Sequence, residues 1–329
     1  MTGSWSGCWE SNPVSTHPKR VYYRYTTSRR RPDFTSGFLF PKFFLVTSGK
    51  KIWESFFRKQ NPIYYILLKW FGQCYYMYMV KQVIVNNLLI SYSEQKGESG
   101  RALLFLHGWR SNKEVWNGVI SQMSKVKCQM FAIDLPGFGG SQVPPKPMTV
   151  GNYADVAAEF IKKLDLKNVI VIGHSFGGRV GIKLASKYPE LIGKLVLVDS
   201  AGFPMEASRK KLMALAAKIV KPIFKPQMMQ GLRKKIYKKI GAEDYLATPE
   251  LQKTFVNITS EDLSEDMKKI QAPTLMIYGQ NDKVTPVTYG ELMKFLILNS
   301  KFVMLKNAGH FSFLDQPEEF VEALSGFLK

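Results

Sequence analysis

Cysteine and histidine are both rare in this chain, whose 329 residues include three cysteines and four histidines. The cysteines, Cys8, Cys74 and Cys128, are too few and too widely spaced for a disulfide framework or a cysteine-rich zinc site. A reducing compartment is therefore expected, and we predict a cytoplasmic protein. The sequence also lacks the ligand spacing of a zinc site, so we expect neither a metal nor a cofactor.

Acidic residues are scarce as well, because 26 Asp and Glu stand against 46 Lys and Arg, which gives a net charge of +20. Such an excess suggests binding to nucleic acid. The excess is local, however: residues 1–80 hold 12 basic and three acidic side chains, and residues 203–240 hold 11 and one. No nucleic-acid-binding motif accompanies the charge, and aromatic residues do not alternate with it, so nucleic acid is disfavoured as a partner.

Regular hydrophobic periodicity is missing from most of the first 79 residues, and so is the layout of a secretory signal. Residues 61–80 are apolar enough and long enough to span a bilayer, although Lys69 and Gln73 would be unfavourable at the centre. Three interpretations stay open. Residues 1–79 are an extension that is disordered apart from one amphipathic helix, or an arm that associates with a membrane through residues 61–80, or no part of the native protein, which then starts at Met77 or Met79.

From residue 80 the pattern becomes that of a globular α/β protein, and 45 % hydrophobic residues exclude wholesale disorder. Strands are expected at 83–85, 88–90, 102–106, 129–133, 169–172, 195–198, 274–278 and 302–305, the first two joined by an Asn86-Asn87 turn. Helices are expected at 113–124, 155–164, 176–187, 287–297 and 318–328. Repeated strand–helix alternation predicts a mostly parallel sheet covered on both faces, with its chemistry at the carboxyl ends of the strands.

A candidate nucleophile lies between the strand at 169–172 and the helix at 176–187. The segment reads Gly173-His174-Ser175-Phe176-Gly177, the G-x-S-x-G pattern in which a serine occupies a sharp strand-to-helix turn and small residues on either side avoid clashes. The turn also directs the N–H groups at the start of the helix toward a developing oxyanion. We therefore predict that Ser175 is the nucleophile.

A serine nucleophile needs a base, and the base needs a carboxylate that fixes its tautomer. His310 follows the last predicted strand and Asp282 follows the strand before it, so both lie on loops at carboxyl ends. The order Ser175, Asp282, His310 is a known order of nucleophile, acid and base. Asp199 is the rival acid, its other role being to cap the loop that enters the following insertion, and Asp134 is interpreted as structural.

Two backbone N–H groups are expected to form an oxyanion hole. One belongs to Phe176, directly after the nucleophile, and the other to Trp109, on a loop where Gly108 permits close approach. We also expect His107, Gly108 and His174 to contribute to substrate binding. His107 is in addition interpreted as a structural hydrogen-bonding residue.

Five motifs together resemble those of the α/β-hydrolase superfamily: HGW at 107–109, DLPGFG at 134–139, GHSFGG at 173–178, GQNDKVTP at 279–286 and AGHFSFLDQP at 308–317. The resemblance implies an eight-stranded, mostly parallel sheet flanked by helices, with an antiparallel second strand and a helical cap inserted after the sixth strand. Serine rather than aspartate at the elbow favours acyl cleavage over dehalogenation. The segments at 107–116 and 134–141 are similar to those of carboxylesterases, including the type that cleaves the methyl ester of pimeloyl-carrier protein, and to those of hydrolases that split C–C bonds.

The predicted domains are a hydrolase core, formed by residues 80–202 and 268–329, and a helical basic cap at 203–267. Lysines and arginines in the cap alternate with apolar residues at helical spacing, which predicts an amphipathic helix pair with its apolar face over the pocket. A second interpretation is a cationic docking surface for an acidic carrier protein or an anionic lipid.

The predicted function is a serine hydrolase that cleaves a small carboxylic ester through an acyl-enzyme. Two alternatives stay open: C–C bond hydrolysis of ring-cleavage-type diketones on the same triad, and a non-catalytic member of the fold that binds a ligand or partner.

Overall fold

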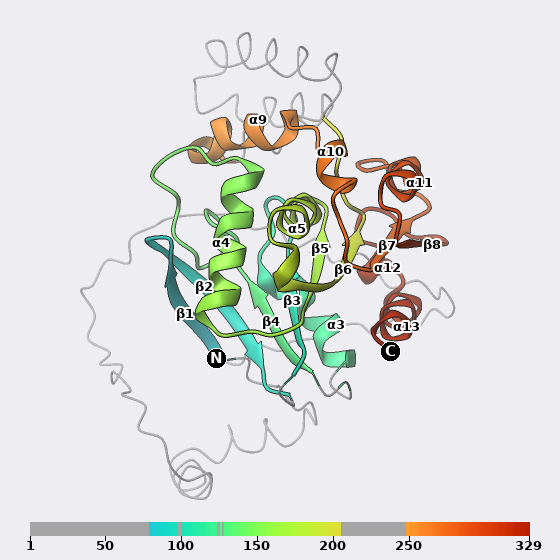
Figure 1. Ribbon diagram of the computed structural model, residues 1–329, viewed down its shortest axis with the longest axis horizontal. Helices are drawn as coiled ribbons and strands as arrows, with labels where there is room; N and C mark the ends of the chain where they lie inside the picture. The colour runs from blue at the N-terminus through green and yellow to red at the C-terminus, as the bar shows by residue number, and fades with distance from the viewer. Residues whose placement is uncertain (1–78, 98–99, 124–125, 127, 205–247) are drawn as a thin grey trace, which may run out of the picture. The chain divides into compact units, whose positions relative to one another are not determined.

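The computed structural model describes residues 79–97, 100–123, 126, 128–204 and 248–329 (Figure 1). The strands are β1 Met79–Val85, β2 Leu88–Gln95, β3 Ala102–Leu106, β4 Gln129–Ile133, β5 Val169–His174, β6 Ile192–Val198, β7 Thr274–Gly279 and β8 Ser300–Leu305. The α-helices are α3 Asn117–Gln122, α4 Val150–Lys163, α5 Phe176–Lys187, α9 Gln252–Ser260, α10 Ser264–Met267, α11 Val287–Leu296, α12 Ser312–Asp315 and α13 Pro317–Leu328. Short 3-10 helices occur at η1 Lys113–Trp116, η3 Pro189–Leu191 and η5 Pro249–Leu251.

The eight strands form one sheet in the order β1-β2-β4-β3-β5-β6-β7-β8. Strand β2 is antiparallel to both of its neighbours, and the pairs from β4 to β8 are parallel. A tight turn joins β1 to β2, with φ angles of 47° at Asn86 and 60° at Asn87. Asparagine tolerates this left-handed backbone and so suits a two-residue hairpin. The prediction of an eight-stranded, mostly parallel sheet with an antiparallel second strand is confirmed.

Alternate side chains of each central strand pack into two different hydrophobic cores, one on each face of the sheet. In β3, Leu104 and Leu106 pack with helices α4 and α5, whereas Leu103 and Phe105 pack with helices α3 and α13 on the opposite face. Residues of a strand point alternately to the two faces, so a run that is apolar throughout must be covered on both sides. The helices in Figure 1 accordingly lie on either side of the sheet.

Several elements differ from the prediction in their bounds; β1 and β2, for example, are longer than expected, at Met79–Val85 and Leu88–Gln95. Helix α4 begins at Val150 rather than at residue 155, because Thr149 and Asn152 form a capping box that satisfies N–H groups at the helix start. Strand β6 begins at Ile192, three residues early, and the four-residue helix α12 precedes α13. The helix expected at 113–124 is divided into η1 and α3.

The connection between β6 and β7 contains the segment predicted to be a cap. Its described part includes α9, which lies over loops that follow β3 and β4. Phe255 of α9 contacts Trp109 with a ring-centroid distance of 5.2 Å, and Thr254 accepts a hydrogen bond of 3.0 Å from the Met148 N–H. The basic residues between 209 and 239, and residues 1–78 of the extension predicted at 1–79, lie outside the described residues, whereas Met79 and Val80, at the end of the apolar stretch 61–80, begin β1.

Within the ranges that the structure describes, no helix is long and apolar enough to cross a lipid bilayer.

Candidate active site

Ser175 occupies a strained turn between β5 and α5. Its φ of 52° and ψ of −109° lie outside the conformations that a non-glycine residue ordinarily adopts. A Cβ on Gly173 would lie 2.4 Å from the Gly177 carbonyl oxygen, and one on Gly177 would lie 2.4 Å from the Leu106 carbonyl oxygen. Both glycines are therefore required by backbone crowding, and the turn presents the Ser175 side chain at the carboxyl end of the sheet.

Three side chains from separate loops meet at this turn. The Ser175 Oγ lies 3.1 Å from His310 Nε2, and His310 Nδ1 lies 2.8 Å from Asp282 Oδ2. Since the carboxylate accepts from Nδ1–H, the Nε2 lone pair faces the serine hydroxyl and accepts a hydrogen bond from it. The structure thus brings together the three residues predicted as nucleophile, base and acid.

Thr285, a residue to which the sequence analysis assigned no role, helps to hold Asp282. Its hydroxyl lies 2.7 Å from Asp282 Oδ2, while the N–H groups of Val284 and Thr285 donate to Oδ1 at 2.7 and 3.1 Å. Burial alone would raise the pKa of Asp282, but the hydrogen bonds from His310 and Thr285 outweigh it and lower the pKa below its ordinary value. Asp282 is therefore anionic at neutral pH and oriented toward His310.

Asp199 follows β6 and is engaged differently. Its carboxylate accepts backbone N–H groups from Gly279 at 2.8 Å and Ser312 at 3.0 Å, and its own carbonyl oxygen lies 2.9 Å from the Thr285 hydroxyl oxygen. Burial raises the pKa of Asp199 to about 6, although these hydrogen bonds act in the other direction. Asp199 joins the loops that carry the site, and the contact to the His310 ring is made by Asp282.

The loop after β3 approaches Ser175 closely. A Cβ on Gly108 would lie 2.8 Å from His174 Nδ1 and 3.4 Å from the Ser175 Cβ, so only glycine fits between them. Trp109 follows, and its ring contacts Phe138, Phe176 and Phe255. Phe176 is the first residue of α5, and the first N–H groups of a helix have no acceptor within the helix. The two predicted oxyanion donors therefore belong to segments that meet at Ser175.

His107 is fully buried and bonded at both ring nitrogens. Nδ1 lies 2.7 Å from the Gly108 carbonyl oxygen, to which it donates, and Nε2 accepts the Leu135 N–H at 3.0 Å. Burial lowers the pKa of His107 to about 4, so the ring is neutral. These contacts match the structural role and leave no ring nitrogen for a substrate, so His107 is not a substrate-binding side chain.

Asp134 is buried in a second cluster of hydrogen bonds, in line with its interpretation as a structural residue. It accepts the Lys113 Nζ and the Gly140 N–H at 2.7 and 2.8 Å, and its other oxygen accepts the Lys113 N–H. The carboxylate thus fixes the turn after β4 against η1.

His174, the third residue predicted to bind substrate, is 1 % exposed. Its Nε2 lies 2.7 Å from the carbonyl oxygen of His310, and its ring is enclosed by Trp116, Phe311 and Phe313. The prediction of a substrate contact is corrected, because burial and the bond to His310 keep this ring away from a ligand.

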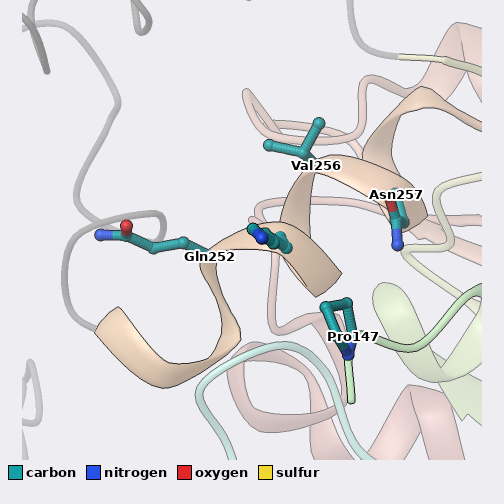
Figure 2. Close-up of a pocket in the computed structure, with 5 residues that line it drawn as sticks. Pro147, Gln252, Val256 and Asn257 are labelled. Carbon is teal, nitrogen blue, oxygen red and sulfur yellow. The ribbon is translucent and has the colours of Figure 1, made fainter.

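A hollow of about 510 Å³ lies on the side of α9 that is away from Phe255 and is lined by Pro147, Gln252, Lys253, Val256 and Asn257. Figure 2 shows Gln252, Val256 and Asn257 along the helix, with Pro147 on a neighbouring loop. None of the triad residues lines it, and the candidate site is therefore assigned from the triad geometry. Among the described residues, no three His, Cys, Asp or Glu side chains gather as a metal site would require.

An eight-stranded sheet of this order, with a serine on the turn between its fifth strand and the next helix, defines an α/β-fold hydrolase. The sequence model described as Alpha/beta hydrolase family matches residues 103–323. The chain belongs to this family.

Several relatives of the chain are described as hydrolases or esterases. It is 26 % identical over 256 residues to the AB hydrolase superfamily protein YisY of Bacillus subtilis (strain 168), covering 69 % of this chain and 91 % of the relative. It is 29 % identical over 246 residues to a pimeloyl-(acyl-carrier protein) methyl ester esterase of Nitrosomonas europaea, covering 68 % and 94 %. A solved structure of a bacterial membrane phospholipase A has a TM-score of 0.63 and 27 % identity, covering 76 % of this chain and 86 % of that chain.

Proposed function

We propose that this protein is a serine hydrolase that cleaves a carboxylic ester through an acyl-enzyme. The observation that supports it most directly is the continuous path from Ser175 Oγ through the His310 ring to Asp282, with heavy-atom distances of 3.1 and 2.8 Å. The strained backbone of Ser175 and the start of α5 beside it add the geometry that acyl transfer needs.

In the proposed mechanism, His310 Nε2 takes the hydroxyl proton as Ser175 Oγ attacks the ester carbonyl carbon. The backbone N–H groups of Phe176 and Trp109 stabilise the resulting oxyanion, and Asp282 stabilises the imidazolium. His310 then gives the proton to the leaving alcohol, and the acyl-enzyme forms. A water molecule, deprotonated by His310, repeats the attack and releases the acid and Ser175.

The ester is the preferred substrate class because the relatives named above include a methyl ester esterase and a phospholipase. The same triad could hydrolyse a C–C bond in a ring-cleavage-type diketone, which is the second candidate reaction. A non-catalytic binding role is the third reading. Binding alone, however, gives no reason for a hydroxyl and an imidazole held within hydrogen-bond distance on a strained turn.

The proposed substrate is a small ester, and the proposed compartment is the cytoplasm. Residues 203–240 carry 11 basic side chains and one acidic side chain, which would suit an acidic carrier protein or an anionic lipid that delivers the ester. If so, raising the salt concentration should slow turnover of a carrier-bound ester and leave turnover of a small neutral ester unchanged. An equal salt response of the two substrates would remove the docking proposal.

Labelling by a fluorophosphonate separates an enzyme from a binding protein. The native chain should be labelled, and Ser175→Ala should not, because the probe reacts with an activated serine. A series of p-nitrophenyl esters of graded chain length, with a vinylogous diketone beside it, then separates ester from C–C hydrolysis. A native chain that neither takes up the probe nor turns over any substrate would refute the catalytic proposal.

A further inference from the structure

His174 precedes the nucleophile and lies between the two loops that the proposed mechanism uses. It ends β5, its ring centroid is 4.9 Å from that of His310, and a Cβ on Gly108 would come within 2.8 Å of its Nδ1. The loop of the base is on one side of the ring and the loop of the oxyanion donor is on the other. A histidine whose role was only to fill the core would not need contacts with both of these loops.

The hydrogen bond of His174 fixes its tautomer. A carbonyl oxygen only accepts, so the 2.7 Å contact between His174 Nε2 and the His310 oxygen requires that Nε2 carries the proton. Nδ1 then presents a lone pair, and in the described structure this buried atom has no hydrogen-bond partner. Since the added Cβ replaces a Cα hydrogen, the 2.8 Å distance means that one Cα–H of Gly108 points at Nδ1, a weak interaction that only glycine can provide.

The ring is neutral throughout the working range of a hydrolase. Burial and, to a smaller extent, the neighbouring His310 together lower the pKa of His174 to about 3. His174 therefore keeps donating to the His310 carbonyl when the His310 ring becomes charged. It cannot serve as a second base that competes with His310 for the serine proton.

Among the hydrogen bonds that hold the loop carrying the base, three act on the backbone of residues 308–310. The Asn281 N–H donates to the Ala308 oxygen at 2.8 Å, and Asp315 accepts the Gly309 N–H at 2.8 Å. The third is the bond from His174, which acts on His310 itself and comes from the residue beside Ser175. This bond joins the backbone of the base to the side chain of the residue that precedes the nucleophile.

We propose that His174 is a positioning residue, which sets the distance between Ser175 Oγ and His310 Nε2 by donating to the His310 carbonyl. The inference rests on the proposed function. Displacement of a catalytic group by about 1 Å can slow a reaction about 100-fold, so this bond is expected to affect kcat. KM should change little, because the buried ring does not reach a substrate.

Glutamine and methionine at position 174 form the test, because the two side chains have equal length and differ in the donor. Gln can place an amide N–H near the position of Nε2, whereas Met is adaptable but cannot donate. With a p-nitrophenyl ester, kcat should fall about 10- to 100-fold in His174→Met and remain within about threefold of the native value in His174→Gln. KM should stay constant in both variants. Phe313→Leu is the packing control, since it loosens the same ring cluster without removing a hydrogen bond to His310.

Thermal unfolding identifies variants that fail to fold. If His174→Met fails to fold, His174→Asn replaces it, because the asparagine amide is too short to reach the carbonyl. Equal kcat values in the glutamine and methionine variants, whether high or low, would overturn the positioning role. A change in KM with constant kcat would return His174 to substrate binding and would also overturn it. A native chain that hydrolyses no ester and takes up no fluorophosphonate refutes the proposed function itself, a result that the native protein gives before any variant is made.

Discussion

Asp282 and Asp199 follow neighbouring parallel strands, and because their partners differ, the same substitution should affect catalysis at one and stability at the other. Asp282→Asn can present an N–H to His310 Nδ1 and so reverse the tautomer of the base, which should lower kcat about 10³- to 10⁴-fold. Asp199→Asn leaves that contact intact. It should instead lower the free energy of unfolding by about 1–3 kcal/mol, because an amide cannot accept both of the N–H groups that meet the carboxylate.

Ester turnover and urea denaturation of the two variants check this division. A large loss of kcat in Asp199→Asn with an unchanged rate in Asp282→Asn would exchange the roles of the two aspartates.

Because two histidines are buried and neutral, we expect the free energy of unfolding to decrease at acidic pH. Burial lowers the pKa from an ordinary value of 6.5 to about 4 for His107 and to about 3 for His174. Below pH 6.5 the unfolded chain therefore binds protons that the folded chain refuses, and stability is lost as the pH falls toward those values. Asp199 acts in the opposite sense, since its pKa is raised to about 6 and its contribution to stability is lost as the pH rises through that value.

The two histidines have the larger combined shift, so the unfolding free energy should be lower at pH 5 than at pH 7.5, by on the order of 2 kcal/mol. Urea denaturation at the two pH values measures the difference. His107→Gln, which cannot titrate, should reduce it. An unfolding free energy that rises between pH 7.5 and pH 5 would mean that Asp199 dominates.

At the scale of elements, α5 does more than follow the turn that carries Ser175, the proposed nucleophile. Arg179, Lys183 and Ser186 lie on successive turns and all bind the connection between β6 and β7. Arg179 donates to the carbonyls of Phe203, at 3.0 Å, and Glu261, and the Lys183 Nζ lies 2.9 Å from Glu261 and 2.6 Å from Asp266. The helix thereby holds both ends of the connection.

Lys183→Met should lower the free energy of unfolding by about 1–2 kcal/mol, because it leaves two partly buried carboxylates without their cation. Lys187→Met is the matched control. It removes an ion pair with Asp155 from the next turn of the same helix, where the Lys187 side chain is 47 % exposed rather than 18 %, and should change stability by less than about 1 kcal/mol. If chemical denaturation shows equal losses of unfolding free energy in the two variants, the ion pairs between Lys183 and the β6–β7 connection stabilise the fold no more than an exposed ion pair does.

The sequence predicted the elements and residues that follow local rules. Apolar runs gave the central strands, the Asn86-Asn87 pair gave the hairpin, and small residues around Ser175 gave the elbow. The start of α4 was missed because its signal is a capping box outside the apolar periodicity. Thr285 and the bond from His174 were missed for another reason: their partners come from other loops, and spacing along the chain carries no information about that contact.

For the whole molecule, a chain that begins at Met77 tests whether the first 76 residues support the hydrolase core. Every described strand pair lies within residues 79–329, with β1 paired to β2 from Met79 onward. The shortened chain should therefore unfold within about 4 °C of the full chain, a difference of at most about 1 kcal/mol for a protein of this size. Calorimetry of both chains, with ester turnover as a second readout, measures this. Loss of cooperative unfolding in the shortened chain would place residues 1–76 within the folded unit.

The three triad side chains are far apart in the chain: 135 residues separate Ser175 from His310, and 28 separate Asp282 from His310. His310 follows β8, the strand at the edge of the sheet, so it is the last of the three residues to be synthesised. Under the proposed mechanism, ester turnover appears only once His310 lies beside Ser175, so turnover reports that the site is complete. A refolding experiment that follows turnover and tryptophan fluorescence together would compare completion of the site with formation of the core, without any added label.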